Sequence, residues 1–329
     1  MGGDRAPEEI AQGVLEAARE QDVKILLVGP QEVLDFHLKR DGLSSSNVIP
    51  VPASQVVAMA ESPTDAWKNK QDSSIAVGVR LVKEGRADAF LSAGNTGAIV
   101  AASLMLLGTM DGTDRPAISS LFTTTQGKLA LVLDIGATPE CRAPHLAQFG
   151  RLGSDFMAKM FKYDRPTVGL LSNGEEESKG TRVVKEAHQL LKKSGLNFIG
   201  NIEGFDVPRG KADVIVTDGF TGNVMLKLAE SLTESIFLSL KQALGASTAA
   251  RATKMLWGPP IRSVVRQWDY TTVGGAPLLG VNGNIVMAHG NSSAADIKDG
   301  IRLARQMITE CWVMHKEPGI LAQGGVHLT

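Results

Sequence analysis

The chain has 329 residues, of which 43% are hydrophobic, and a formal net charge of -1 at pH 7. This content is ample for the core of one large α/β domain or two ordinary ones. The near-neutral charge argues against a protein that binds nucleic acid over its whole surface, and the 5% aromatic content disfavours platforms that stack nucleobases. Two cysteines, Cys141 and Cys311, are too few for a disulfide framework and fit a reducing cytoplasm. The apolar run at 98–108 is too short to span a bilayer, so we expect a soluble or peripheral protein.

The first seven residues, MGGDRAP, look like a loop that follows a strand. Pro7 suits a first helical turn, and the acids at 8 and 9 suit a helix N-terminus. No strand precedes this loop in the sequence. We expect truncation of a short first strand rather than a start site assigned too late.

Apolar runs of strand length alternate with segments of helical period along most of the chain, which predicts βαβ units and a mostly parallel sheet. Strands are expected at 24–28, 87–91, 129–134, 167–171, 212–217 and 284–288. Five of them run into polar loops: SAGNTG (92–97), DIGATPE (134–140), SNGEEESKG (172–180), TDGFTGN (217–223) and HGNSS (289–293). Because the carboxyl ends of parallel strands meet at one edge, these loops are predicted to share one crevice.

Two of these loops are built alike, SAGNTGA (92–98) and TDGFTGN (217–223). Each turns from an apolar run into an apolar, helix-like stretch, so free backbone N–H groups and the positive end of a helix dipole would face a bound anion. Neither loop carries a Walker lysine pattern or a G-x-G-x-x-G motif, so the anion need not be a nucleotide.

Asn95 and Thr96 could donate hydrogen bonds to such an anion, or they could only shape the turn and cap the helix. Asp218, Thr221 and Asn223 pose the same choice, with Asn223 a good cap for the following helix. Lys227, one turn further on, could lean toward an anion or be a solvated charge.

Glu175, Glu176 and Glu177 are interpreted mainly as acids that complement a helix dipole, with Lys179 the more interesting neighbour. His289 follows an apolar run and could donate a proton to a leaving thiolate. There is no G-x-S-x-G elbow and no clustered His/Cys set for a metal. Direct attack by a bound substrate therefore fits better than a covalent enzyme intermediate, and phosphate as the nucleophile would need the anion cradle that these loops can supply.

Residues 224–270 break the alternation and are expected to form a helical hairpin within a single α/β domain, 1–329. Leucine and isoleucine residues at 226, 232, 236, 240 and 244 keep helical spacing until Gly245. No acid occurs from 241 to 268, where cations and apolar residues interleave: Lys241, Arg251, Lys254, Leu256, Trp257, Ile261, Arg262, Val265 and Arg266. This pattern indicates either a membrane-surface element or dock for an acidic partner, or a helical pair buried in a dimer interface.

Seven motifs in order resemble the PlsX family of phosphate acyltransferases: MGGDRAP, SAGNTGA, GEEESKG, NFIGNIEG, KADVIVTDGFTGN, GGAPLLGVNG and HGNSSA. The resemblance implies transfer of a long-chain acyl group from acyl carrier protein to inorganic phosphate. The acyl phosphate would feed the membrane glycerol-3-phosphate acyltransferase of phospholipid synthesis. It also implies a three-layer α/β/α fold akin to phosphate acetyltransferases and isopropylmalate dehydrogenases, a cytoplasmic homodimer at the membrane surface, and no metal or organic cofactor.

From the motifs we expect His289, Asn95, Lys179 and Asn223 to be catalytic. The expected substrate-binding residues are Asp4, Ser92, Gly94, Thr96, Gly97, Asp134, Glu175, Asp218, Gly219, Thr221, Gly222, Lys227, Gly290 and Ser292. The cations and apolar residues of the hairpin, from Lys241 to Arg266, would contact membrane or carrier protein.

The sequence departs from the family pattern in three places. No strand precedes MGGD, Ser172 stands where the family has Asn, and Thr138 stands where Asn is common. Two other functions remain open. One is a short-chain phosphate acetyl- or butyryltransferase that uses coenzyme A, and the other is a non-enzymatic membrane-surface scaffold.

Overall fold

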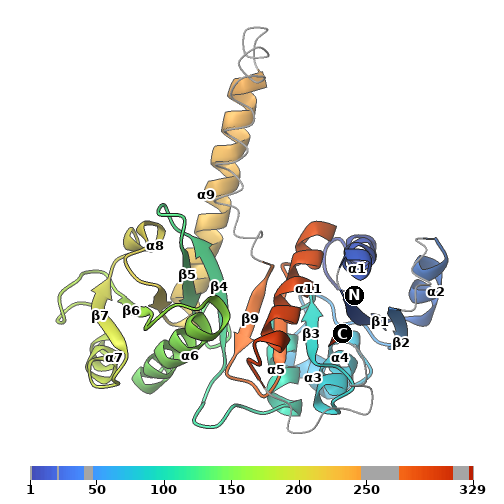
Figure 1. The fold of residues 1–329 in the computed structure, drawn as a ribbon, viewed down its shortest axis with the longest axis horizontal. Coiled ribbons are helices and arrows are strands. Elements are labelled where there is room, and N and C mark those ends of the chain that lie inside the picture. The colour runs from blue at the N-terminus through green and yellow to red at the C-terminus, as the bar shows by residue number, and fades with distance from the viewer. Residues whose placement is uncertain (1, 21, 41–46, 246–273, 314–325, 329) are drawn as a thin grey trace. The chain divides into compact units, whose positions relative to one another are not determined.

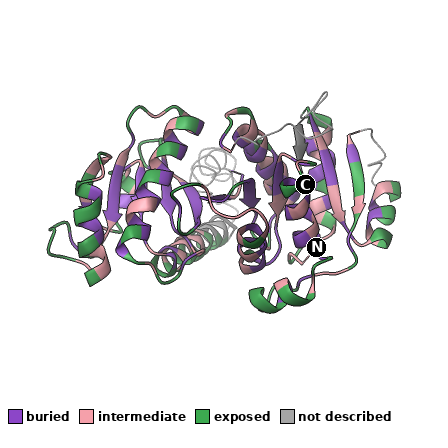
Figure 2. Cartoon of the chain, turned by 90° about the horizontal axis from the view of Figure 1, so that it is seen from below, coloured by how far each residue is buried: buried purple, intermediate pink, exposed green. Residues whose placement is uncertain are grey.

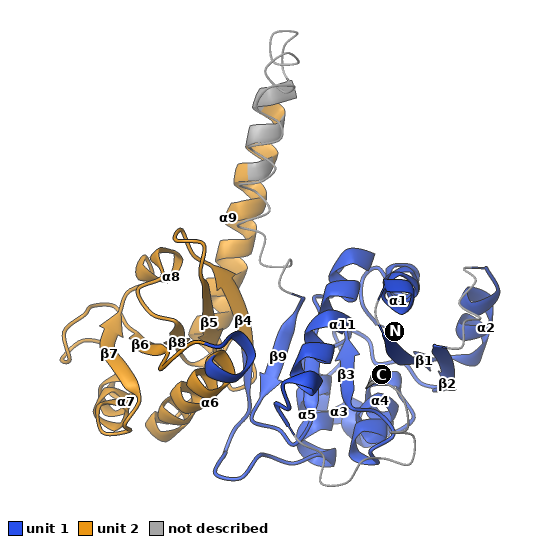
Figure 3. Cartoon of the chain, viewed as in Figure 1, with its two compact units in different colours: residues 1–118, 158–162, 273–329 blue, residues 119–157, 163–272 orange. Residues whose placement is uncertain are grey.

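A computed structural model describes residues 2–20, 22–40, 47–245, 274–313 and 326–328, in which helices and strands alternate along the chain (Figure 1). Its contacts divide the chain into two compact units (Figure 3). Unit 1 comprises residues 1–118, 158–162 and 273–329, and unit 2 comprises residues 119–157 and 163–272. The α/β fold with a mostly parallel sheet that the sequence predicts is confirmed.

The strands of unit 1 run in the order β2-β1-β11-β3-β10-β9, and β9 then pairs with the first two residues of β4. Only the β10–β9 and β9–β4 pairs in this order are antiparallel. The strands are β1 Val23–Gly29, β2 Val48–Pro52, β3 Ala89–Ser92, β4 Ala117–Thr123, β9 Ala276–Leu279, β10 Asn284–Met287 and β11 Val326–Leu328. The helices are α1 Glu8–Glu20, α2 Gln31–Arg40, α3 Pro63–Asn69, α4 Ser74–Lys83, α5 Thr96–Leu106 and α11 Ala294–Thr309.

The strands of unit 2 run in the order β4-β5-β8-β6-β7, with β4 antiparallel to β5 and the rest parallel. They are β5 Leu129–Leu133, β6 Thr167–Leu171, β7 Asn197–Ile202 and β8 Val214–Val216. The helices are α6 Ala143–Phe161, most of which belongs to this unit, α7 Arg182–Lys192, α8 Asp206–Arg209 and α9 Gly219–Gly245.

The buried side chains concentrate on the strands and on the inner faces of the helices (Figure 2). In unit 2, all three residues of β8 and four of the five residues of β5 are buried. Such continuous apolar runs are typical of parallel strands that helices cover on both faces.

All six strands expected from the sequence are present, with boundaries that differ by up to two residues. Five further strands, β2, β4, β7, β9 and β11, carry weaker signals. Two prolines lie within β2, Gly200 interrupts β7, and β11 has only three residues. The helix predicted to close at Gly245 is described as far as that residue, which is the last before the undescribed residues 246–273. Residues 246–270 of the expected hairpin, with Arg251, Lys254, Leu256, Trp257, Ile261, Arg262, Val265 and Arg266, lie outside the described residues.

Candidate active site

The loop between β3 and α5 is built around Asn95, the N-cap of the helix. Its Oδ1 accepts a hydrogen bond from the Ala98 N–H at 3.0 Å. Its Nδ2 donates to the carbonyl oxygens of Ala58, Met59 and Glu61 at 3.1, 3.0 and 2.9 Å. The side chain is only 6% exposed, so both ends of the amide are occupied by the protein itself. Asn95 is thus the cap, and Thr96 is the first helical residue.

The turn that receives Asn95 is held by a carboxylate and an ammonium group. Glu61 accepts hydrogen bonds from Lys70 Nζ at 2.7 Å and from the Ala58 N–H at 3.1 Å. Lys70 Nζ also donates to the Val56 carbonyl at 2.8 Å. The hydrogen bond from Lys70 lowers the pKa of Glu61, with a further contribution from the Ala58 N–H. Neither residue stood out in the sequence, since 34 residues separate Glu61 from Asn95.

The start of α5 offers unpaired donors. Among the residues that the structure describes, no acceptor faces the backbone N–H of Thr96 or Gly97. Thr96 is exposed, and Gly94 N–H is satisfied by Ser92 Oγ at 3.1 Å. Two free N–H groups at a helix N-terminus, with the positive end of the dipole behind them, suit an anion.

Three loops of unit 1 meet beside this helix start. The Asp4 N–H donates to the Gly290 carbonyl at 2.7 Å. A methyl carbon built on Gly3 would lie 2.9 Å from the Ala93 oxygen and 3.1 Å from the Gly290 oxygen, so the backbones approach too closely for any side chain there. The structure therefore brings together three predicted groups: Asp4, the Ser92–Gly97 loop and the His289–Ser292 loop.

His289 is exposed at the carboxyl end of β10. Its Nδ1 lies 2.8 Å from Asn291 Oδ1, and the buried Ser292 donates its N–H to the His289 carbonyl at 3.0 Å. Asn291 thereby fixes the ring orientation through Nδ1. The Asn291 N–H also approaches Nδ1, at 3.3 Å, and Nε2 has no hydrogen-bond partner among the described residues.

In unit 2, Asp134 serves its own loop. Its fully buried carboxylate accepts hydrogen bonds from the N–H groups of Gly136, Ala137 and Thr138 at 3.0, 2.9 and 2.6 Å. A buried charge is stable when backbone donors satisfy it in this way. The Asp134 carboxylate thus organises residues 134–138.

The second of the twin loops is locked onto residues 134–138. Gly219 N–H donates to the Thr138 carbonyl at 3.0 Å, and Asn223 Nδ2 donates to the Ile135 carbonyl at 3.0 Å. A methyl carbon on Gly222 would lie 2.0 Å from the Asp134 carbonyl oxygen. The two loops therefore form one interlocked structure.

Asp218, rather than Asn223, caps α9. Its Oδ1 accepts from the Thr221 N–H and its Oδ2 from the Thr221 hydroxyl, both at 2.8 Å. The helix begins at Gly219, so the expectation that Asn223 caps it is wrong. The start of α9 already holds a carboxylate, whereas the start of α5 does not.

Two of the three acids at 175–177 are paired with lysines. Glu175 forms an ion pair with Lys211, which raises the pKa of Lys211, and Glu177 accepts from Lys192 at 2.6 Å, which lowers the pKa of Glu177. The following helix, α7, begins only at Arg182 and has no acid in its first turn. The interpretation that these acids complement a helix dipole is therefore wrong.

Lys179 and Lys227 are both exposed in unit 2, and their ammonium groups have no ion-pair partner among the described residues. They are thus available to an anionic ligand. Lys241 lies in the last turns of α9. In the described part of the chain, no group of three or more His, Cys, Asp or Glu residues could hold a metal ion.

Comparison of the sequence with known proteins shows which family the chain belongs to. A sequence model described as "Fatty acid synthesis protein" matches residues 1–314. The chain is 45% identical over 307 residues to a phosphate acyltransferase of Dehalococcoides mccartyi, covering 93% of this chain and 88% of that relative. It is also 45% identical over 314 residues to a phosphate acyltransferase of Heliobacterium modesticaldum, covering 95% and 93%. The chain belongs to the phosphate acyltransferase (PlsX) family. It is therefore an acyltransferase.

Solved structures support the fold expected of a phosphate acyltransferase. A phosphotransacetylase from Streptococcus pyogenes aligns with a TM-score of 0.62 and 21% identity, covering 92% of this chain and 93% of that chain. A 4-hydroxythreonine-4-phosphate dehydrogenase from Klebsiella pneumoniae aligns with a TM-score of 0.51 and 14% identity, covering 90% and 95%. At these identities the likeness concerns the fold alone. In the described helices of this phosphate acyltransferase family member, none combines the length and apolarity needed to cross a membrane.

Proposed function

We propose that this protein transfers a long-chain acyl group from an acyl-carrier-protein thioester to inorganic phosphate and releases acyl phosphate for phospholipid synthesis. The observation that carries the proposal is the start of α5, where the N–H groups of Thr96 and Gly97 lack acceptors among the described residues. The kinship with phosphate acyltransferases supports phosphate as the acceptor substrate.

Phosphate is assigned to the α5 loop rather than to the α9 loop because of charge. A phosphate at α9 would meet the Asp218 carboxylate that already caps the helix. At α5 the cap is the neutral amide of Asn95. Asn95 is thus proposed to be a positioning residue, which sets the direction of the N–H groups without a free donor of its own.

The reaction needs only one displacement. A phosphate oxygen attacks the thioester carbonyl carbon, the carbon–sulfur bond breaks, and the departing thiolate takes a proton. His289, whose Nδ1 is engaged by Asn291, is proposed to deliver that proton from Nε2. The thioester oxyanion is assigned to backbone N–H groups of the His289–Ser292 loop.

The remaining predicted roles belong to the same proposal. Lys179 and Lys227 would bind acidic carrier protein or phosphate, since their ammonium groups are exposed. Large apolar side chains are exposed along α9, namely Phe220, Val224, Leu228, Leu232, Ile236 and Leu238. Such a helix, followed by the cationic segment up to Arg266, supports peripheral membrane contact, a homodimer and delivery to the glycerol-3-phosphate acyltransferase.

The decisive assay is phosphate-dependent release of free thiol from palmitoyl-acyl carrier protein, repeated with acetyl-coenzyme A. We expect release with the carrier-protein thioester, saturation by phosphate, and little reaction with acetyl-coenzyme A. Preference for acetyl-coenzyme A would point to the short-chain acyltransferase. Release that does not depend on phosphate, or an acyl group trapped on a side chain, would contradict the direct attack.

A further inference from the structure

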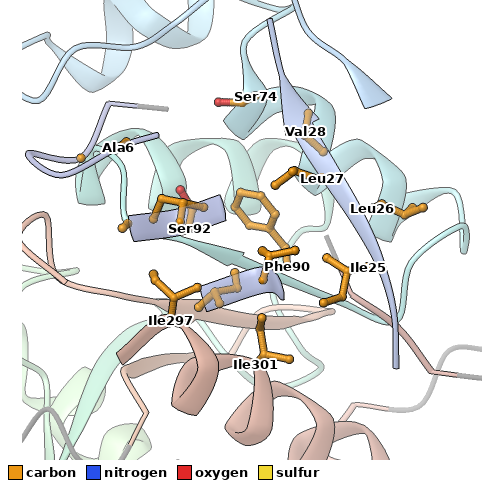
Figure 4. Close-up of a pocket in the computed structure, with 15 residues that line it drawn as sticks. Ala6, Ile25, Leu26, Leu27, Val28, Ser74, Phe90, Ser92, Ile297 and Ile301 are labelled. Atoms are coloured by element: carbon orange, nitrogen blue, oxygen red, sulfur yellow. The ribbon is translucent and has the colours of Figure 1, made fainter. Parts of the chain in front are cut away.

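A buried histidine of unit 2 has no role in the proposed reaction. His188 lies on α7 and is only 3% exposed. Unit 1, by contrast, contains a pocket of about 80 Å³ with apolar walls that include Phe90, Ile297 and Ile301 (Figure 4). None of the described residues that line this pocket carries a titratable side chain. The contacts of His188 indicate a role that the apolar pocket does not offer.

His188 contacts β7 and the 172–180 loop. Its Nδ1 lies 2.9 Å from Asn201 Oδ1, and its ring packs edge-on against Phe198 with the ring centroids 5.0 Å apart. Its Nε2 lies 3.5 Å from Glu177 Oε1. Both nitrogens of this buried ring therefore face a polar partner.

Phe198 and Asn201 reach the same ring because β7 carries a bulge. In a regular strand, residues three positions apart point to opposite faces. The pairing of β6 with β7 passes from residues 168 and 198 to residues 169 and 200, which leaves one extra residue in β7. Gly200 has a φ of +98°, a conformation that glycine adopts readily. The bulge thus turns Asn201 toward α7, and bulges beside functional sites commonly re-aim a side chain in this way.

The hydrogen bonds of Asn201 fix the tautomer of His188. Asn201 Nδ2 donates to the Glu176 carbonyl at 2.9 Å, and a carbonyl oxygen can only accept. The orientation of the amide is therefore set, and Oδ1 is the atom that faces Nδ1. Because an amide oxygen also only accepts, Nδ1 must carry a proton.

The Glu176 carbonyl connects this network to Lys179. It accepts a second hydrogen bond from the Lys179 N–H at 2.9 Å. Three successive hydrogen bonds thus lead from the imidazole of His188 to the backbone of Lys179. The ammonium group of Lys179 is exposed and has no ion-pair partner among the described residues.

Two further contacts of the loop are exposed ion pairs. Glu175 pairs with Lys211 and Glu177 pairs with Lys192, and these side chains are between 36% and 58% exposed. Exposed pairs contribute little to stability, whereas a hydrogen bond between buried groups is stronger because the local dielectric constant is low. Asn201 is only 4% exposed. The contact between His188 and Asn201 should therefore dominate the position of the loop.

We propose that His188 is a positioning residue, which acts through Asn201 to hold the turn from Glu176 to Lys179 so that the Lys179 ammonium group meets an anionic substrate. That anion is phosphate or the acidic carrier-protein thioester, so this role rests on the proposed function. Without the contact, Lys179 would still be present, but part of its binding free energy would be spent on ordering the loop.

Hydrogen exchange of the whole protein tests the positioning without an assay of acyl transfer. In His188→Phe, which retains an aromatic ring but no nitrogen, the amide of Lys179 should exchange about tenfold faster. Asn201→Asp serves if His188→Phe does not fold, because it retains the acceptor for His188 and loses the donor to Glu176. Unchanged exchange at Lys179 in a folded variant would overturn the proposal.

Two matched variants and one spectrum complete the structural test. His188→Asn can replace Nδ1 by an amide donor and should restore most of the protection. Lys192→Met, which removes only the exposed partner of Glu177, should exchange like the wild type. In wild-type protein with ¹⁵N-labelled histidine, long-range ¹H–¹⁵N correlations should show the proton of the neutral His188 ring on Nδ1. A neutral ring protonated on Nε2 alone would contradict the network.

Steady-state kinetics tests whether His188 acts through Lys179. With phosphate and palmitoyl-acyl carrier protein varied in turn, His188→Phe should raise by about tenfold the same KM that Lys179→Met raises, with kcat nearly unchanged. Which KM rises identifies the anion. The double variant should be no worse than Lys179→Met alone, and additive effects would overturn the proposal. If the wild type releases no thiol, the proposed function fails, while the exchange and spectroscopic results still decide whether His188 holds the loop.

Discussion

The side-chain amide of Asn95 donates to the main-chain carbonyl of Glu61 at 2.9 Å, across 34 residues of sequence. The same amide reaches the carbonyls of Ala58 and Met59, while its oxygen caps α5. One buried side chain thus joins a helix start to the turn that supports it. Because Nδ2 only donates hydrogen bonds and Oδ1 only accepts them, the effects of substituting Asn95 can be predicted.

Asn95→Asp should be more damaging than Asn95→Ala. Alanine loses the cap and leaves carbonyls without a donor, which should lower the free energy of unfolding by about 2–4 kcal/mol. Aspartate keeps the capping oxygen but turns a carboxylate oxygen toward three carbonyl oxygens at a site only 6% exposed. Urea unfolding of the two variants and the KM for phosphate measure these effects. Greater stability of Asn95→Asp than of Asn95→Ala would show that the carbonyl bonds contribute little.

The phosphate KM should depend on the ionisation of Glu61. Because the hydrogen bond from Lys70 lowers the pKa of Glu61, the ionised carboxylate stabilises the folded turn. That stabilisation is complete above the pKa of an unperturbed glutamate and is lost as pH falls through the lowered value. We therefore expect the KM for phosphate to rise only on the acid side of the ordinary glutamate range.

Lys70→Met should move this acid-side rise of the KM to higher pH, since the pKa of Glu61 returns toward its ordinary value. Lys68→Met is the matched control, because Lys68 is exposed in α3, just before the C-cap residue Lys70, and has no ion pair among the described residues. The ionisation of phosphate itself is the same for the wild type and for both variants, so it cancels in the comparison. If the KM for phosphate depended on pH in the same way in Lys70→Met and Lys68→Met, the ionisation of Glu61 would not control phosphate binding.

Gly222→Ala should strongly destabilise unit 2. The added carbon would lie 2.0 Å from the Asp134 carbonyl oxygen, and a backbone atom held by the 134–138 loop cannot move aside cheaply. We expect a loss of about 2–3 kcal/mol in the free energy of unfolding. Gly204→Ala is the control, because a carbon added there meets nothing within 4 Å. Equal unfolding midpoints for the two variants would mean that the loops separate easily.

The twin loops show where prediction from sequence succeeds and where it stops. Apolar runs followed by small polar residues were enough to place both loops at strand ends, because burial of a parallel strand leaves a clear pattern. The similarity of the two loop sequences did not reveal that their helices begin at different positions. Helix α5 begins at Thr96, the fifth residue of its loop, whereas α9 begins at Gly219, the third residue of its loop. That difference depends on which side chain caps each helix.

The partners of the caps could not be read from the sequence. Asn95 finds its acceptors in a turn 34 to 37 residues away, and Asn223 finds its acceptor 88 residues away. Such contacts arise only when the strands are already in register. By contrast, Asp134 bonds N–H groups two to four residues ahead, a local pattern that sequence alone could have indicated.

Thr96→Pro should remove one backbone donor at the start of α5 without disturbing the helix. Proline is accepted at the first helical position, and it removes the Thr96 N–H, for which no acceptor exists among the described residues. Asn95, with φ -57° and ψ 111°, is already outside the α region that is disfavoured for a residue before proline. The helix should therefore form as before, with one fewer donor for phosphate.

We expect Thr96→Pro to lower kcat/KM for phosphate on the order of a hundredfold, as loss of one preorganised donor does. Thr96→Ala keeps the N–H and removes only the hydroxyl, so it should retain most of the activity. Initial rates of thiol release at varied phosphate, with circular dichroism to confirm the fold, distinguish the two. If both variants lose activity equally, the hydroxyl is the group that matters. If folded Thr96→Pro is fully active, phosphate does not bind at the start of α5.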